Sequence, residues 1–267
     1  MDLKLTGKYA LVTGSTSGIG AGVAEGLARE GVVVVIHGRS AERSATVADR
    51  IRDAGGSAHV ALGDLETDAG AKAVIDQALQ AVPQIDILVN NIGGPVEGRL
   101  SFFDTTVDEW IDSYNSNAVA GIRMIHQLVP AMRDRGWGRV IQISSRNSIS
   151  PHNNMPSYGA AKAATNNFSL GLSKELAFTG VTSNAIMPGL IYTQQLDTFL
   201  ENIANRQMEG DIEKAKDFVL KNICRQTVSR LGIVEDIAHY VCFLASPNAD
   251  FITGTVLRID GGSTPTV

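Results

Sequence analysis

The sequence has little of what a metal site needs. Its only two cysteines, Cys224 and Cys242, have no metal-ligand spacing, and Cys242 lies in the apolar run I-A-H-Y-V-C-F-L-A. We therefore expect both to be packing thiols. The five histidines are scattered and form no H-E-x-x-H pattern. The sequence accordingly predicts no metal site.

Long apolar runs and an excess of positive charge are also missing. The longest apolar run, Val32 to Ile36, is far too short to cross a bilayer, and the start M-D-L-K-L-T-G-K lacks the core of a signal peptide. We expect a cytoplasmic protein with no membrane partner. The formal net charge is −5 and no dense Lys/Arg patch occurs, so we expect no nucleic-acid partner.

The composition is that of a soluble globular protein with many tight turns. The chain has 267 residues, 44% of them hydrophobic, and 27 glycines. We expect one domain over residues 1–267. Short apolar runs alternate with helical stretches, which predicts an α/β fold: a Rossmann-like, doubly wound parallel sheet of about seven strands flanked by helices. Ligands bind such sheets at the carboxyl ends of the strands.

A glycine-rich turn follows the first expected strand. Tyr9 to Val12 is apolar, T-G-S-T-S-G-I-G follows, and the segment from Ala21 to Glu30 is helical in pattern. Glycines let the backbone approach a ligand, and a helix N-terminus attracts a pyrophosphate. The spacing is G-x-x-x-G-x-G rather than G-x-G-x-x-G, so an ordinary turn is the alternative. The expected cofactor-binding residues here are Gly14, Ser15, Ser17, Gly18, Ile19 and Gly20.

The end of the second expected strand bears on the choice of cofactor. The β-branched run from Val32 to His37 leads into Gly38-Arg39-Ser40. An acid about 20 residues after the glycine turn would accept the ribose 2′-OH of NAD, whereas an arginine accommodates the 2′-phosphate of NADP. Arg39, with Ser40, therefore favours NADP(H). The alternative is a solvated surface arginine, with NAD(H) as the cofactor.

A tyrosine and a lysine stand four residues apart in the alanine-rich segment Tyr158-Gly-Ala-Ala-Lys162. This spacing puts both side chains on one face of a helix. A neighbouring cation favours the phenolate and lowers the pKa of the tyrosine, which can then act as an acid or a base. The alternative is a packed tyrosine beside a solvated lysine.

These segments, in this order, resemble the short-chain dehydrogenase/reductase family, including its 3-oxoacyl-(acyl-carrier-protein) reductases. The resemblance runs from about Gly7 to Gly262 and includes the T-G-x-x-x-G-x-G turn, N-N-I-G at 90–93, Y-x-x-x-K, and the ending T-G-x-x-x-x-x-D-G-G. Ile92 replaces the family's alanine, and Ser17 stands where many NADP-using members have a basic residue. The resemblance implies hydride transfer between a nicotinamide and a carbonyl or secondary alcohol.

The resemblance also implies roles for individual residues. Ser145, thirteen residues before Tyr158, would hold the carbonyl oxygen, with Ser144 as the fallback. Tyr158 would exchange the proton and Lys162 would contact the nicotinamide ribose. Asn117 would hold a water that links the lysine to solvent. The further cofactor-binding positions are Asp64 and Leu65 near the adenine, Asn91 and Gly93 beside the cofactor, and Pro188, Gly189 and Thr193 near the nicotinamide.

Two segments bear on the substrate. Residues 190–230 carry Leu196, Phe199, Leu200 and Ile203 at helical spacing, which predicts a lid whose apolar stripe faces the pocket or the underlying core. The polar stretch after Ser145 predicts either a solvated loop or contacts from Arg146, Asn153 or Asn154 to a polar substrate group.

With NADP(H) favoured, a 3-oxoacyl-type carbonyl reductase is expected. An NAD-dependent secondary-alcohol or sugar dehydrogenase is the alternative. A non-catalytic dinucleotide sensor or scaffold would be expected to lack one of the Asn, Ser, Tyr and Lys residues, and all four are present. The resemblance further implies a homo-oligomer, typically a tetramer.

Overall fold

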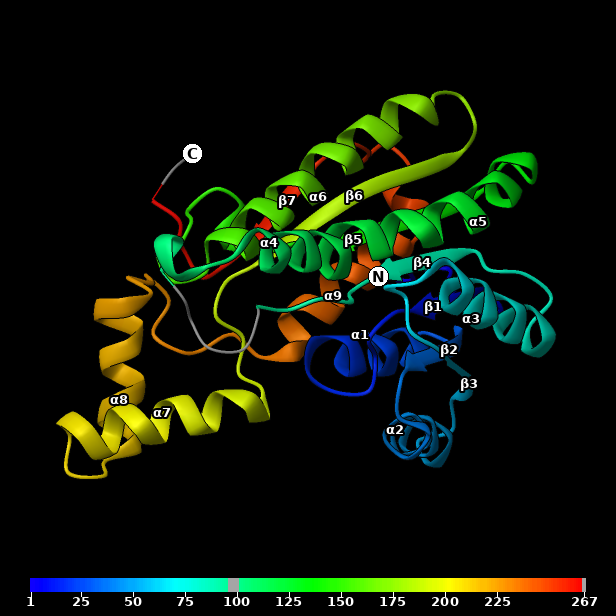
Figure 1. Ribbon diagram of the computed structural model, residues 1–267. Helices are drawn as coiled ribbons and strands as arrows, with labels where there is room; N and C mark the ends of the chain where they lie inside the picture. The colour runs from blue at the N-terminus through cyan, green and yellow to red at the C-terminus, as the bar shows by residue number, and fades with distance from the viewer. Residues whose placement is uncertain (96–100, 266–267) are drawn as a thin grey trace.

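The computed structural model, which describes residues 1–95 and 101–265, is built on one parallel sheet (Figure 1). Its seven strands lie in the order β3-β2-β1-β4-β5-β6-β7. The predicted Rossmann-like fold is confirmed. The strands are β1 (Tyr9–Val12), β2 (Val33–Gly38), β3 (Ser57–Leu62), β4 (Ile87–Asn90), β5 (Gly138–Ile143), β6 (Val181–Pro188) and β7 (Val256–Ile259).

Helices cover both faces of the sheet, so its central strands are buried on both sides. One face packs against α1 (Gly18–Arg29), α2 (Ala41–Asp53) and α9 (Val234–Ala245). The other packs against α3 (Asp68–Ala81), α5 (Ala120–Asp134) and α6 (Pro156–Glu175). The two resulting hydrophobic clusters explain why β1, β2, β4 and β5 consist almost entirely of buried residues.

The strand order reverses at β1, which pairs with both β2 and β4. The chain moves from β1 outward to β3 and then returns to form β4 on the other side of β1. The chain continues from β1 to α1 on one face of the sheet and from β4 toward α5 on the other face, and such sheets bind dinucleotides where the strand order reverses.

The helical region between β4 and β5 is interrupted in its middle. α4 (Val107–Tyr114) is followed by a π-helical turn, Asn115–Val119, and then by α5. The extra residue in this turn does not show in a hydrophobic periodicity of 3.6, so the sequence pattern alone does not reveal the interruption. A second π-helical turn, Val219–Ile223, follows α8 (Ile212–Phe218), and short 3-10 turns occur at Phe102–Asp104, Arg146–Ser148 and Pro247–Ala249.

The segment between β6 and α9 stands away from the sheet. α7 (Gln194–Gln207) and α8 form a separate lobe, drawn in yellow and orange at the lower left of Figure 1. This lobe has a hydrophobic cluster of its own, in which Leu200 and Ala204 of α7 pack with Ala215 of α8. All four residues of the predicted apolar stripe therefore lie in this small core or pack against it.

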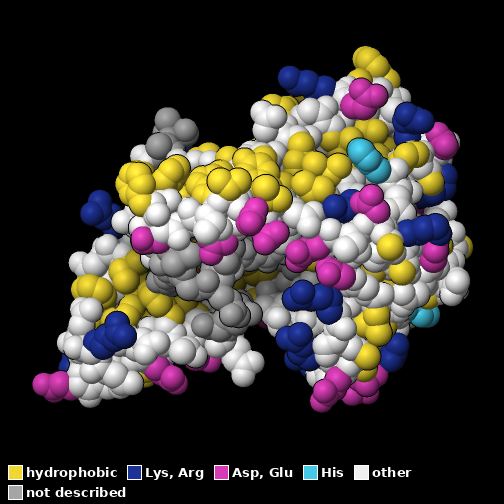
Figure 2. Space-filling model, in the orientation of Figure 1, with side chains coloured by type: hydrophobic (Ala, Val, Ile, Leu, Met, Phe, Trp, Pro, Cys, Tyr) yellow, Lys and Arg dark blue, Asp and Glu magenta, His cyan; other side chains and the backbone are white. Residues whose placement is uncertain are grey.

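The surface around α4 is unusually apolar. Phe103 is 95% exposed and Val107 is 75% exposed, with Phe102 and Ile111 also exposed nearby. Figure 2 shows hydrophobic side chains gathered on this face over α4. Single exposed apolar residues are ordinary, whereas contiguous apolar groups are common at contact surfaces.

No helix within residues 1–95 and 101–265 has the length and apolarity to cross a bilayer. In the same part of the chain, no three His, Cys, Asp or Glu side chains form a group suited to a metal ion.

Candidate active site

The turn between β1 and α1 has the backbone that its glycines predict. Gly14 and Gly18 have φ angles of +63° and +55°, a region that favours glycine. A Cβ on Gly20 would lie 2.5 Å from the carbonyl oxygen of Gly14. Ser17, the N-cap of α1, makes no side-chain capping bond, which leaves the first N–H groups of the helix for another acceptor. The turn therefore fits a pyrophosphate.

The loop after β4 holds this turn in place. The Nδ2 of Asn91 donates to the carbonyl oxygens of Thr13 and Gly14, both at 3.0 Å. The backbone N–H of Asn91 also donates to the Oγ1 of Thr13 at 2.9 Å. Gly93 has a φ of +118° and lies against the side chain of Asn117. Asn91 thus supports the cofactor turn, and Gly93 brings the β4 loop close to the catalytic asparagine candidate.

The positions expected near the adenosine differ in what their side chains do. Arg39 is exposed directly after β2. The Oγ of Ser40 accepts from the N–H of Arg43 and caps α2. The Oδ1 of Asp64 likewise accepts from the N–H of Glu66, while Leu65 is fully buried. Ser40 and Asp64 thus accept hydrogen bonds from the local backbone, whereas Arg39 has an exposed charged group.

Ser145, Tyr158 and Lys162 meet between the end of β5 and the start of α6. Pro156 occupies the first turn of α6, where its fixed φ suits a helix, so Tyr158 and Lys162 follow on one face. Ser145 and Tyr158 both line one cleft, and the Ser145 hydroxyl lies near enough to the phenol to lower its pKa. The Nζ of Lys162 lies 5.8 Å from the centre of the Tyr158 ring. The fallback, Ser144, is instead buried and donates to the carbonyl oxygen of Lys162 at 3.2 Å.

The expected lowering of the Tyr158 pKa by Lys162 is wrong for this structure. Burial raises the pKa of Tyr158, and the nearby Ser145 hydroxyl only partly opposes that rise. Burial also lowers the pKa of Lys162 to about 8. The Nζ of Lys162 donates to the carbonyl oxygen of Ile143 at 2.9 Å rather than to the phenol. Both side chains are buried away from water, and this desolvation disfavours the charged form of each.

Asn117 lies in the middle of the π-helical turn. Its Nδ2 donates to the carbonyl oxygens of Gly94 and Ser113, both at 3.0 Å, while its buried Oδ1 has no partner among the described residues. Its own carbonyl oxygen accepts from the Oγ1 of Thr165 on α6 at 3.3 Å. The wider turn thus places Asn117 against the helix that carries Tyr158 and Lys162.

A cleft with a volume of about 370 Å³ opens in front of Tyr158. Ser145, Asn147, His152 and Asn154 form its polar side. The apolar side comes from Met155 on the loop before α6, from Leu190, Leu196 and Phe199 after β6, and from Ile223. Gly189 and Thr193 also line the cleft, and the methyl group of Thr193 lies close to Gly18. The start of the lid segment therefore reaches the glycine turn.

The polar loop contributes to this cleft differently from what the sequence suggested. Arg146 lines the cleft, but its Nη1 donates to the carbonyl oxygens of Cys224 at 3.2 Å and Ser263 at 3.5 Å. Asn153 is exposed, whereas Asn154 lines the cleft. The sequence reasoning missed His152, which also lines it and whose only signal was its place beside the two asparagines. The buried Nδ1 of His152 and Oδ1 of Asn154 have no hydrogen-bond partner within residues 1–95 and 101–265.

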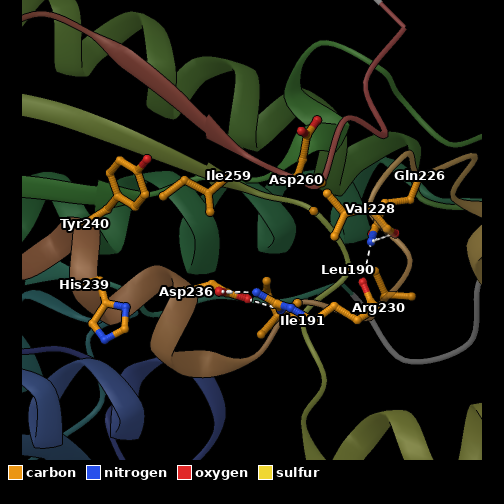
Figure 3. Close-up of a pocket in the computed structure, with 13 residues that line it drawn as sticks. Leu190, Ile191, Gln226, Val228, Arg230, Asp236, His239, Tyr240, Ile259 and Asp260 are labelled. Carbon is orange, nitrogen blue, oxygen red and sulfur yellow. Dashed lines mark hydrogen bonds and ion pairs between the residues drawn. The ribbon is translucent and has the colours of Figure 1, made fainter.

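Both ends of the lid segment are fixed to each other at its base. Tyr192 donates its N–H to the carbonyl oxygen of Gly232 at 2.7 Å, and Gly232 donates to Leu190 at 3.2 Å. Arg230 pairs with Asp236 of α9 through contacts of 2.6 and 2.8 Å, drawn as dashed lines in Figure 3. A pocket of about 230 Å³ adjoins this base and shares Gly189, Leu190 and Ile191 with the cleft. The lobe is therefore anchored where the chain leaves and rejoins the sheet.

Comparisons with known proteins agree with this geometry. The family model described as short chain dehydrogenase matches residues 8–204. An uncharacterized oxidoreductase of Bacillus subtilis, YvaG, is 37% identical over 262 residues, which are 98% of each protein. The 3-oxoacyl-(acyl-carrier-protein) reductase FabG of Aquifex aeolicus is 32% identical over 263 residues, 98% of this chain and 99% of that protein.

A solved structure is similar over the whole chain. The L-sorbose reductase of Gluconobacter frateurii, in a complex with NADPH and L-sorbose, has a TM-score of 0.94 and 30% identity, and the match covers 100% of each chain. The family model covers most of the sequence, and the relatives match from end to end. The chain therefore belongs to the short chain dehydrogenase family of oxidoreductases.

Proposed function

We propose that the protein is an NADPH-dependent carbonyl reductase. The observation that carries the proposal is that Ser145 and Tyr158 line the same cleft, with Lys162 buried beside the Tyr158 ring. The same end of the sheet carries the glycine turn, so a dinucleotide and a carbonyl compound would meet there. When bound, NADPH supplies the hydride.

Ser145 and Tyr158 would act on the carbonyl oxygen. The Ser145 hydroxyl donates a hydrogen bond that holds this oxygen within reach of the phenol. Tyr158 then donates its proton as negative charge develops on the oxygen. Because burial raises the pKa of Tyr158, the phenol remains protonated at neutral pH. A protonated phenol is the form needed for reduction, which supports this direction over alcohol oxidation.

Lys162 and Asn117 would restore the proton. Lys162 has a pKa of about 8, so its ammonium group can give up a proton near neutral pH more readily than an exposed lysine. Its remaining donors suit the ribose hydroxyls of the nicotinamide side. The unpartnered Oδ1 of Asn117 would hold a water that connects Lys162 to solvent.

The cofactor would lie across the carboxyl ends of the central strands. The α1 N-terminus and the turn from Gly14 to Gly20 would hold the pyrophosphate. Arg39 would pair with the 2′-phosphate, which favours NADPH over NADH. The NADPH complex of the similar L-sorbose reductase supports this preference. Asp64 and Leu65 would border the adenine, and Pro188, Gly189 and Thr193 the nicotinamide.

Two substrate classes are candidates. The first is a 3-oxoacyl thioester, the substrate named for the relative from Aquifex aeolicus. The second is a polyhydroxylated ketone, and it rests on a specific observation: His152 and Asn154 line the cleft, and each carries a buried polar atom that no described residue satisfies. Such atoms cost free energy until a ligand satisfies them, and neutral donors and acceptors suit hydroxyl groups.

Initial rates of NADPH oxidation would test these proposals. A 3-oxoacyl thioester and a panel of ketoses would be offered with NADPH and with NADH. Reduction of a ketose that weakens in His152→Phe but is retained in His126→Phe, a change on exposed α5 surface, would favour the second class. A rate of thioester reduction that is unchanged in His152→Phe would favour the first substrate class. No cofactor oxidation with any carbonyl compound would support the non-catalytic alternative.

We further propose a lid and an oligomer. Leu196 and Phe199 of α7 line the cleft, so movement of this lobe about its anchored base would open and close the site. The exposed Phe103 and Val107 near α4 would be covered by a second copy of the chain, and a tetramer is the expected assembly. Light scattering coupled to size exclusion measures the mass.

A further inference from the structure

A buried histidine ties together the two turns that would border the cofactor. His37 lies on β2 and is 1% exposed. Its Nδ1 is 3.0 Å from the backbone nitrogen of Gly14, in the glycine turn after β1. Its Nε2 is 3.2 Å from the carbonyl oxygen of Gly63, at the end of β3. The ring thus bridges the ends of three neighbouring strands.

The two partners determine which form of the imidazole is present. The Gly14 nitrogen carries a hydrogen and can only donate, so Nδ1 must be the acceptor. The Gly63 oxygen can only accept, so Nε2 must carry the hydrogen and donate. Only the neutral ring protonated on Nε2 satisfies both partners. A doubly protonated ring would set Nδ1–H against the N–H of Gly14 and break that bond.

The backbone of His37 holds the same turn. Ser15 donates its N–H to the carbonyl oxygen of His37, and the His37 N–H donates to the Oγ of Ser15, both at 2.9 Å. The ring adds the bond to Gly14, the residue where the turn takes its left-handed conformation. The side chain therefore fixes the orientation of the peptide at which the glycine turn begins.

We propose that neutral His37 is a positioning residue for the dinucleotide. It would hold the turn at Gly14, which would bind the pyrophosphate, and the turn at Gly63, on the adenosine side, in fixed positions relative to each other. It touches neither the substrate nor the reacting atoms, and it acts through Gly14 and Gly63. The proposal rests on the NADPH-dependent function proposed above. It implies that cofactor affinity declines when His37 becomes protonated.

The surroundings of His37 set where protonation occurs. Burial lowers its pKa, and the hydrogen bond to the Gly63 carbonyl and the charge of Asp64 after β3 partly oppose this. Arg39 after β2 lowers it further. The glycine turn from Thr13 to Ser17 contributes no titratable side chain. The ring is therefore neutral at physiological pH, and cofactor binding weakens only below the ordinary histidine range, which centres on a pKa of about 6.5.

Equilibrium titration of NADPH fluorescence from pH 5.5 to 8 tests the proposal through three variants. His37→Phe removes both side-chain bonds at similar volume, and we expect its Kd to rise about tenfold at pH 7.5 because the Gly14 N–H loses its acceptor. His37→Asn places Oδ1 where Nδ1 stood, keeps that acceptor and cannot titrate. We expect its Kd at pH 7.5 to stay within about threefold of wild type. His59→Asn, on β3, is the matched control and should follow the wild-type profile.

The pH dependence distinguishes positioning from simple packing. The 2′-phosphate of NADPH also titrates near pH 6, but equally in every variant. We therefore expect the wild-type Kd to rise more steeply on acidification than that of His37→Asn. Superimposable profiles for these two proteins, or wild-type affinity in a folded His37→Phe, would overturn the proposal. Absence of NADPH and NADH binding by wild type would overturn the proposed function as well, whereas wild-type binding with unaffected variants would overturn the role of His37 alone.

Discussion

Replacement of Lys162 by methionine tests the electrostatics of the active site through stability. Lys162 is 3% exposed, and burial lowers its pKa from 10.5 to about 8. Between these values the unfolded chain binds more protons than the folded chain, so the stability of the wild type rises with pH. From pH 7 to pH 10 the expected gain from this one group is about 2.5 kcal/mol. Methionine has a similar length and does not titrate, so Lys162→Met should lose this gain.

Thermal unfolding of the cofactor-free protein at several pH values measures the effect. For a chain of this size, 2.5 kcal/mol corresponds to about 5–10 °C in Tm. The difference in Tm, wild type minus Lys162→Met, should therefore increase by roughly that amount from pH 7 to pH 10. Protein concentration must be the same in every sample because subunit association stabilises the folded state.

Lys174→Met supplies the control, since Lys174 is exposed on the same helix. Its Tm should follow the wild type within about 2 °C at every pH. Parallel pH profiles for the wild type and Lys162→Met would refute the reasoning, because they would mean that the buried ammonium carries no desolvation cost.

Three further predictions concern the cofactor and the cleft. Arg39→Ala should raise the KM for NADPH by at least about tenfold and leave that for NADH nearly unchanged, since a charged hydrogen bond to the 2′-phosphate is lost; equal cofactor preference in both proteins would contradict the role of Arg39. Gly20→Ala should lower NADPH affinity in a fluorescence titration, because its Cβ would lie 2.5 Å from the Gly14 carbonyl oxygen. Arg146→Ala should lower the Tm by about 2–6 °C while the KM for a neutral ketose changes little, since its guanidinium is engaged with the backbone of Cys224. A large rise in that KM would instead assign Arg146 to the substrate.

The arrangement of strands was accessible from the sequence because local pattern determines it. The β-branched run at Val33–Ile36 and the glycine turn at Gly14–Gly20 specify buried parallel strands and a helix start without long-range information. The approach of Ser145 to Tyr158 was accessible only through family resemblance, since thirteen residues of loop and helix separate them. Their approach at the cleft is a product of tertiary packing.

Other features depend on burial, which the sequence does not state. The i, i+4 spacing of Tyr158 and Lys162 predicted a cation that lowers the phenol pKa, but desolvation dominates both groups. The tie between His37 and the turns at Gly14 and Gly63 joins residues far apart in the chain. Arg146 binds the backbone of Cys224, a distant residue in the chain, whereas His152 lines the cleft. The sequence alone does not show which of the two has which role.

The central claim is that Tyr158 is the proton donor for a carbonyl reduced by NADPH. Tyr158→Phe removes the hydroxyl and keeps the buried aromatic ring. Single-turnover oxidation of bound NADPH by the best carbonyl substrate should slow by about a hundredfold or more, while the Kd for NADPH remains within about twofold of wild type. A rate near that of the wild type, with the cofactor still bound, would contradict the account.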